Sequence, residues 1–130
     1  MIRRLFAALA VAFSLASMAP LPASAQLSEA QVAQALVGVW VWSDTMNGAP
    51  VQHQLTLTGS GSFVYTSAMQ TYQVTSAGNW MYQGGWIGFQ TTSSTSLDPA
   101  GRPVGLGPVQ VLDIGPDFVR TPAGVARRAQ

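Results

Sequence analysis

Residues 36–42 read Leu36-Val37-Gly38-Val39-Trp40-Val41-Trp42, and this stretch decides the fold. Valine and tryptophan favour strands. A glycine two residues before Trp40 lets the backbone bend and leaves room for the ring. The same spacing returns at Gly78-Asn79-Trp80. Tryptophan is the largest apolar side chain, and its indole N–H needs a partner when buried. We therefore expect short strands that close around these indole rings.

After Gly38 the sequence predicts short strands separated by turns. The clearest is 51–58, where apolar and polar residues alternate and His53 falls on the apolar face. Turns are predicted at 44–50, around Asn47-Gly48, and at 77–79. Short antiparallel strands joined in this way predict an all-β meander, most economically closed into a small barrel because closure removes exposed edges. The remaining predicted strands are 39–43, 62–69, 71–76, 80–83, 86–91, 109–114, 118–121 and 125–128.

One short helix is predicted before the strands, at about 28–36. Ser28 can accept a hydrogen bond as the N-cap, and Gln31 stands at the return position of a capping box. Glu29 in the first turn suits the helix dipole. We expect this single α-helix to lead directly into the strand that carries Trp40.

The first 25 residues have the pattern of a secretory signal peptide. Arg3 and Arg4 precede an apolar run over 5–19, and Ala23-Ser24-Ala25 forms a small-residue cleavage site. The alternative is a membrane anchor, but the run is short for a span and prolines follow it. The prediction is a signal peptide at 1–25 and one domain at 26–130, periplasmic or secreted, with no stable membrane anchor after cleavage.

The composition of residues 26–130 limits the possible partners and chemistry. This segment contains four arginines and five acidic residues, which gives a net charge of −1, and the chain has no lysine. Nucleic-acid binding needs a basic stripe that this segment lacks. The chain also has no cysteine, which removes thiol catalysis, zinc–thiolate sites and lipid attachment at a cysteine.

The order of these elements resembles the small bacterial lipocalin-like proteins of the calycin group. The resemblance is carried by Gly38-Val39-Trp40 after a short helix, by Gly61-Ser62-Phe63, by Gly78-Asn79-Trp80, by Ile87-Gly88-Phe89, and by a closing hairpin that ends in arginine. It implies a lipocalin-like barrel in which Trp40 packs at the closed end. It also implies that an arginine from a late strand, Arg120, Arg127 or Arg128, lies across the ring. In this reading the pair is structural.

Few residues offer catalytic or metal-binding chemistry. His53 is the only histidine, and a half-buried imidazole with a hydrogen-bond partner is favoured over a general base or a metal ligand. Met46, Met69 and Met81 with His53 could form a soft copper site, but their spacing repeats no motif and methionine commonly fills gaps. Asp98, Asp113 and Asp117 lie in or beside predicted turns, where aspartate is common, so their positions need no catalytic role. We therefore expect neither an enzyme nor a cofactor.

The aromatic residues are the strongest unusual feature of the sequence. One interpretation is an aromatic-lined pocket for an apolar or sugar ligand, and the alternative is core packing, because small barrels need bulky fillers. The leading functional hypothesis is non-enzymatic binding of a small apolar molecule in the barrel mouth. The predicted ligand-binding residues are Trp42, Tyr65, Trp80 and Trp86. The second functional hypothesis is a protein-interaction module, such as a hydrolase inhibitor or an envelope accessory factor, that uses the polar loop 92–107 to contact a protein partner.

Overall fold

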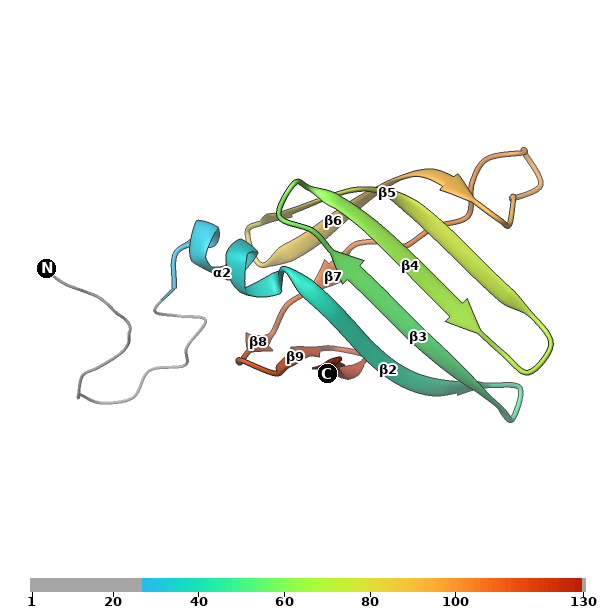
Figure 1. Ribbon diagram of the computed structural model, residues 1–130, viewed down its shortest axis with the longest axis horizontal. Helices are drawn as coiled ribbons and strands as arrows, with labels where there is room; N and C mark the ends of the chain where they lie inside the picture. Colours follow the sequence, from blue (N-terminus) through green and yellow to red (C-terminus); the bar gives the residue numbers. More distant parts are fainter. Residues whose placement is uncertain (1–26, 130) are drawn as a thin grey trace, which may run out of the picture.

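The computed structural model describes residues 27–129; the predicted signal peptide at 1–25 lies outside them. A short helix is followed by strands that form a single antiparallel sheet, in the order β7-β6-β5-β4-β3-β2-β10-β9-β8 (Figure 1). The all-β prediction with one N-terminal helix is therefore confirmed for this part of the chain. The elements are α2 (Glu29–Leu36), β2 (Gly38–Met46), β3 (Ala49–Leu57), β4 (Ser62–Ala68), β5 (Gln73–Gln83), β6 (Trp86–Ser94), β7 (Val109–Gln110), β8 (Asp113–Ile114), β9 (Phe118–Thr121) and β10 (Gly124–Arg128).

The predicted helix is confirmed, including its capping box. The Ser28 hydroxyl accepts from the Gln31 backbone N–H at 3.1 Å, and the Gln31 side chain accepts from the Ser28 N–H at 2.9 Å. Its buried face carries Val32 and Leu36, which pack into the core. The Glu29 carboxylate accepts from the backbone N–H of Gly84 in the β5–β6 turn. The helix is thereby held across one end of the sheet (Figure 1).

Strands β2 to β6 form the predicted meander, with two corrections. The first turn contracts to Asn47-Gly48, both at positive φ, so the flanking strands are longer than predicted. The turn predicted at 77–79 is wrong, because β5 continues through it. Gly78 instead marks a register shift against β6, where an added Cβ would overlap the carbonyl oxygen of Gln90. There the glycine serves a bulge with close strand contact, not a turn.

The sheet curls into a half-barrel, and no hydrogen-bonded ladder joins its edge strands β7 and β8 in the described residues. The single strand predicted at 109–114 divides at Val111 and Leu112. The N–H of Val111 donates to Gly85 O at 2.8 Å, while the N–H of Leu112 donates to Arg120 O at 2.8 Å. Two consecutive residues thus contact opposite edges of the sheet. The chain passes from β7 to β8 at these two residues, and the two edge strands are not otherwise joined by a ladder, so the barrel is not closed in the described part of the chain.

The core lies inside the curl, at the end that α2 covers. Alternation along β3 puts Val51, Leu55 and Leu57 inside, as predicted, with His53 half-buried between them. Phe63 of β4 meets Phe89 of β6 edge to face, with ring centroids 5.0 Å apart. The other buried core residues are Val32, Leu36, Trp40, Ile87, Ile114 and Val119. This end is therefore filled with side chains.

Candidate functional site

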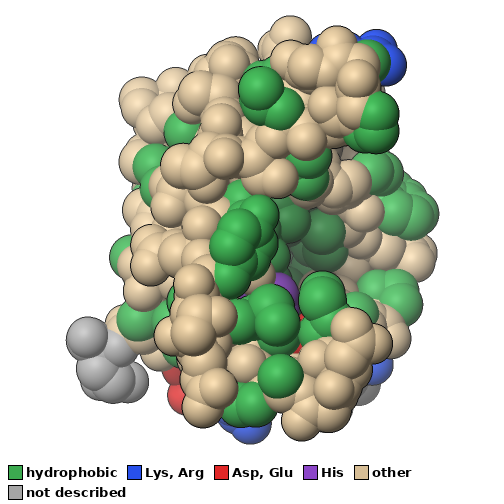
Figure 2. All heavy atoms as spheres, turned by 90° about the vertical axis from the view of Figure 1, so that its right-hand side faces the viewer, with side chains coloured by type: hydrophobic (Ala, Val, Ile, Leu, Met, Phe, Trp, Pro, Cys, Tyr) green, Lys and Arg blue, Asp and Glu red, His purple; other side chains and the backbone are tan. Residues whose placement is uncertain are grey.

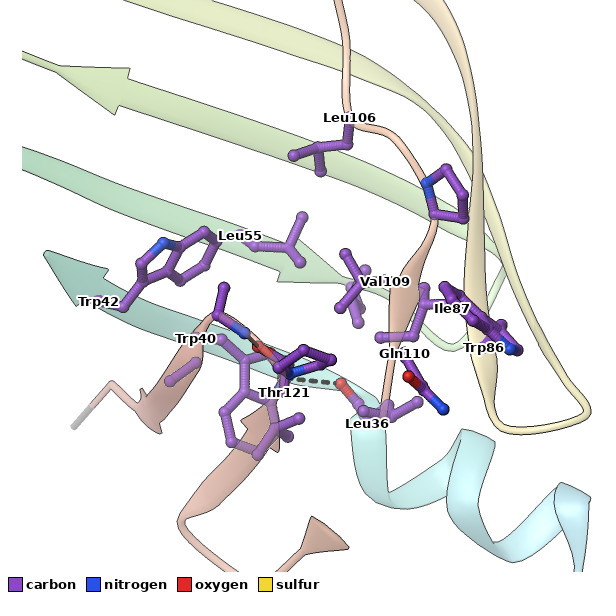
Figure 3. Close-up of a pocket in the computed structure, with 16 residues that line it drawn as sticks. Leu36, Trp40, Trp42, Leu55, Trp86, Ile87, Leu106, Val109, Gln110 and Thr121 are labelled. Atoms are coloured by element: carbon purple, nitrogen blue, oxygen red, sulfur yellow. Dashed lines mark hydrogen bonds between the residues drawn. The ribbon is translucent and has the colours of Figure 1, made fainter. Parts of the chain in front are cut away.

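An apolar cavity of about 320 Å³ lies inside the curl, between β2 and β3 on one side and β6 and β7 on the other (Figure 3). Leu36 and Trp40 line the part nearest α2, and the exposed β9–β10 turn at 121–123 contributes to the wall. Gln110 and Thr121 are the polar side chains in the lining. The remaining lining residues are apolar: Trp42, Leu55, Leu57, Trp86, Ile87, Leu106, Pro108, Val109, Val119, Pro122, Ala123 and Ala126.

The four predicted ligand-binding residues fall in three places. Trp42 and Trp86 line the cavity from opposite walls (Figure 3). Tyr65 is the cross-strand neighbour of the lining residue Leu55 and lies beside the cavity, outside its lining. Trp80 is elsewhere: its indole N–H donates to Thr58 O at 3.0 Å, and its ring borders a shallow depression beside α2.

The half-buried, hydrogen-bonded imidazole predicted for His53 is confirmed, but its two partners, Asp44 and Tyr65, were not predicted. Asp44 Oδ1 lies 3.0 Å from Nε2 of His53, and the Tyr65 hydroxyl lies 2.7 Å from Nδ1. The imidazole is 12% exposed, whereas the Asp44 side chain is 61% exposed. Trp42 stacks on the imidazole, with centroids 4.9 Å apart and planes 10° apart. We call these four residues the mouth cluster.

The chemistry of these groups fixes the direction of the hydrogen bonds. An ionised carboxylate only accepts, so Nε2 of His53 carries the proton that is donated to Asp44. When the ring carries this one proton, Nδ1 is an acceptor and the Tyr65 hydroxyl donates to it. In that form the Tyr65 hydroxyl proton is used in the hydrogen bond to the imidazole. The phenol oxygen has a second hydrogen-bond partner in the Ser67 hydroxyl.

The environment of Tyr65 favours its neutral form. Burial raises the pKa of the phenol above its ordinary value of 10.0, and the negative charge of Asp44 adds to this, while the Ser67 hydroxyl acts in the opposite direction. A phenol that holds its proton more tightly is a hydrogen-bonding group rather than a nucleophile or a base.

The mouth cluster adjoins the cavity. Trp42 belongs to both, and Tyr65 is the cross-strand partner of the lining residue Leu55. Figure 2 views the molecule at the end away from α2 and shows a hollow with hydrophobic side chains within it and a histidine among them. The polar groups of Asp44, His53 and Tyr65 therefore lie next to the cavity at Trp42, outside its lining.

The Gly-x-Trp element lies at the opposite, filled end. The Trp40 indole N–H donates to Leu36 O at 2.8 Å, and the Arg128 guanidinium lies 4.4 Å from the centre of the indole ring. Of the three arginines that the resemblance left open, the structure thus places Arg128 across Trp40. Arg127 is exposed beside it on β10, and Arg120 faces Asp113 at 3.9 Å.

Two of the three methionines named with His53, Met46 and Met81, lie away from it. Met46 is 55% exposed at the end of β2, and Met81 is 60% exposed on the outer face of β5, whereas His53 lies on the inner face of β3. Within residues 27–129 no group of three or more His, Asp or Glu side chains is placed to hold a metal ion. In the same range no helix has the length and apolar character needed to cross a membrane.

The loop predicted at 92–107 begins later, because β6 extends to Ser94. Its return segment is fixed to the sheet by the buried Ser76, whose hydroxyl donates to Val104 O at 2.7 Å and lies 3.0 Å from Ser94 Oγ. Leu106 then reaches the cavity wall. The loop therefore forms part of the cavity as well as part of the surface.

A search of protein-family models, curated proteins and solved structures gave no match to this chain.

Proposed function

We propose that this protein binds a small, predominantly apolar molecule in the cavity between β2 and β6. The observation that carries the proposal is the cavity itself, about 320 Å³ with an almost wholly apolar lining. That volume falls within the range of about 300–1,000 Å³ that is usual for small-molecule sites. A ligand that covers this apolar surface and removes it from water gains about 25 cal/mol of binding free energy per Å².

The distribution of aromatic residues supports the proposal. If the tryptophans were only core fillers, all would be expected to pack as Trp40 does, which is 2% exposed. Trp42 and Trp86 line the cavity as Trp40 also does, but Trp42 is only partly buried and Trp86 is 46% exposed. Large apolar side chains left facing a cavity are typical of a ligand site.

Binding without chemical conversion is the form of the proposal that fits the mouth cluster. His53 has both ring nitrogens engaged, by Asp44 and by Tyr65. Tyr65 retains its proton, because its pKa is raised by burial. We include in the proposal a lipocalin-like carrier role, exported to the periplasm or beyond, on the basis of the Gly38-Val39-Trp40 element and the N-terminal sequence.

The second sequence hypothesis, a protein-contact role for loop 92–107, is less favoured. Ser76 fixes the loop backbone at Val104, and Leu106 belongs to the cavity wall. These two contacts explain the course of the loop without a protein partner, because both attach it to the sheet and the cavity wall.

The test is a titration of the purified protein with N-phenyl-1-naphthylamine, a neutral apolar dye that fluoresces when it leaves water. We expect saturable binding of one dye per chain, with quenching of tryptophan fluorescence. Ala126→Phe should weaken binding more than tenfold, because Ala126 lines the cavity and a phenyl ring would fill it.

The matched control is Val125→Phe, which puts the same ring on the adjacent, 43% exposed position of β10. This variant should bind the dye as the wild type does. Absence of saturable binding in the wild type would overturn the proposal, and so would equal binding by the two phenylalanine variants.

A further inference from the structure

We propose that the mouth cluster selects the charge of the ligand: it is a subsite for a cationic head group, so the ligand is an amphiphilic ammonium compound with an apolar body. This inference rests on the proposed function, since it names the class of molecule that the cavity would take.

The first argument is the hydrogen-bonding character of the cluster. The Tyr65 proton is committed to Nδ1 of His53, and the Nε2 proton of His53 is committed to Asp44. The Asp44 carboxylate, whose side chain is 61% exposed, remains to face a ligand, and it is an acceptor. The cluster therefore suits a head group that donates hydrogen bonds.

The second argument is charge. Asp44 lies on the inner-face positions of β2 beyond Trp40 and Trp42, at the end away from α2, and its side chain is 61% exposed. The carboxylate accepts a hydrogen bond from Nε2 of His53 and forms no ion pair with an arginine of the described residues. The cavity lining contains no charged side chain. A cation at the mouth would meet this one carboxylate, and an anion would be repelled by it.

The third argument is the position of the arginines in the described residues. Arg128 is held at the filled end over Trp40, and Arg120 faces Asp113. Arg102, in the loop that follows β6, lies 3.7 Å from Asp98. Arg127 is exposed on β10, and none of these four arginines forms an ion pair with Asp44; the lining also contains no cationic side chain that could pair with an acidic head group.

The aromatic rings add to the preference for a cation. The ring planes of Trp42, His53 and Tyr65 are within 23° of parallel, with centroid separations of 4.9 to 6.2 Å. Indole and phenol faces attract cations, with the greatest effect where water is displaced. A head group beside Trp42 would therefore contact a carboxylate and aromatic surface, while its tail follows Leu55 into the cavity.

The experiment compares three ligands with the same eight-carbon tail at neutral pH: octylammonium, octanol and octanoate. Each is titrated against the dye-loaded wild-type protein, and displacement gives its affinity. We expect octylammonium to bind about tenfold more tightly than octanol, and octanoate to bind most weakly. Asp44→Asn should reduce octylammonium affinity about tenfold and leave octanol unchanged. Asp117→Asn, at an exposed position away from the cavity lining, makes the same change in net charge and should alter neither.

The outcomes separate this inference from the proposed function. Displacement of the dye by octanol or octanoate at least as strongly as by octylammonium would overturn the cationic subsite and leave apolar binding intact. A protein that binds neither the dye nor any octyl ligand would overturn both. The ligand series uses the wild type alone, so the inference stays testable if Asp44→Asn fails to fold.

Discussion

The guanidinium carbon of Arg128 lies 4.4 Å from the centre of the Trp40 indole. The same side chain donates to Val37 O and Ala35 O at 3.0 Å and to Pro116 O at 2.8 Å. It therefore joins the C-terminal end of α2, the start of β2, the β8–β9 turn and β10. A cation there also complements the negative end of the helix dipole.

Replacing Arg128 should destabilise the fold. Arg128→Met keeps an unbranched apolar chain over Trp40 but loses three charge-assisted hydrogen bonds, so we expect a loss of about 2–4 kcal/mol in the free energy of unfolding. Urea denaturation followed by tryptophan fluorescence measures it. Arg127→Met, at the exposed neighbouring position, is the matched control and should cost less than about 0.5 kcal/mol. Equal losses in the two variants would contradict the assigned role.

Gly38 is required for the position of Arg128. Its φ is +143°, and an added Cβ would overlap Nη1 of Arg128. Gly38→Ala should cost about 2–3 kcal/mol, through backbone strain and displacement of the guanidinium. Gly59→Ala is the control, since Gly59 has ordinary φ and open space around it.

A double-mutant cycle tests this link between Gly38 and Arg128. In an Arg128→Ala background the overlap is gone, so Gly38→Ala should cost at least about 1 kcal/mol less than in the wild type. Additive losses would show that Gly38 is needed for its backbone conformation alone.

The raised pKa of Tyr65 predicts how stability depends on pH. Above the ordinary value of 10.0 the unfolded chain loses the phenol proton while the folded chain retains it. The folded state then binds more protons, so stability that is fully present below pH 10.0 falls as the pH rises through the raised pKa. Urea denaturation at about pH 8 and about pH 11 measures this fall.

Tyr65→Phe should show a smaller fall than Tyr72→Phe, which removes a phenol at a 57% exposed position. The difference between these two variants is the contribution of Tyr65. The same fall in both would contradict a protonation preference at Tyr65.

The Ser76 hydroxyl should control the mobility of the return segment of the loop. Ser76→Ala removes the donor to Val104 O and leaves that carbonyl without its 2.7 Å partner. We expect hydrogen exchange to quicken at 102–106 and stability to fall by about 1 kcal/mol. Hydrogen exchange with mass spectrometry resolves the segment. Ser93→Ala, at an exposed position of β6, should leave exchange at 102–106 unchanged.

The sequence by itself determined the features that depend on neighbours in the chain. Ser28 and Gln31 define the helix start, Asn47-Gly48 defines a hairpin, and the alternation around His53 defines the inner face of β3. Each follows from backbone geometry and side-chain period over a few residues.

Only the tertiary structure decided the contacts between distant segments. The turn signal at Gly78 became a bulge because β6 passes close to it, and the choice among three arginines fell on Arg128 because β10 pairs with β2. His53 forms hydrogen bonds with Asp44 on the neighbouring strand β2 and with Tyr65 on the neighbouring strand β4. Composition cannot show such contacts, because strand pairing and the packing of one face set them across up to 93 residues of chain.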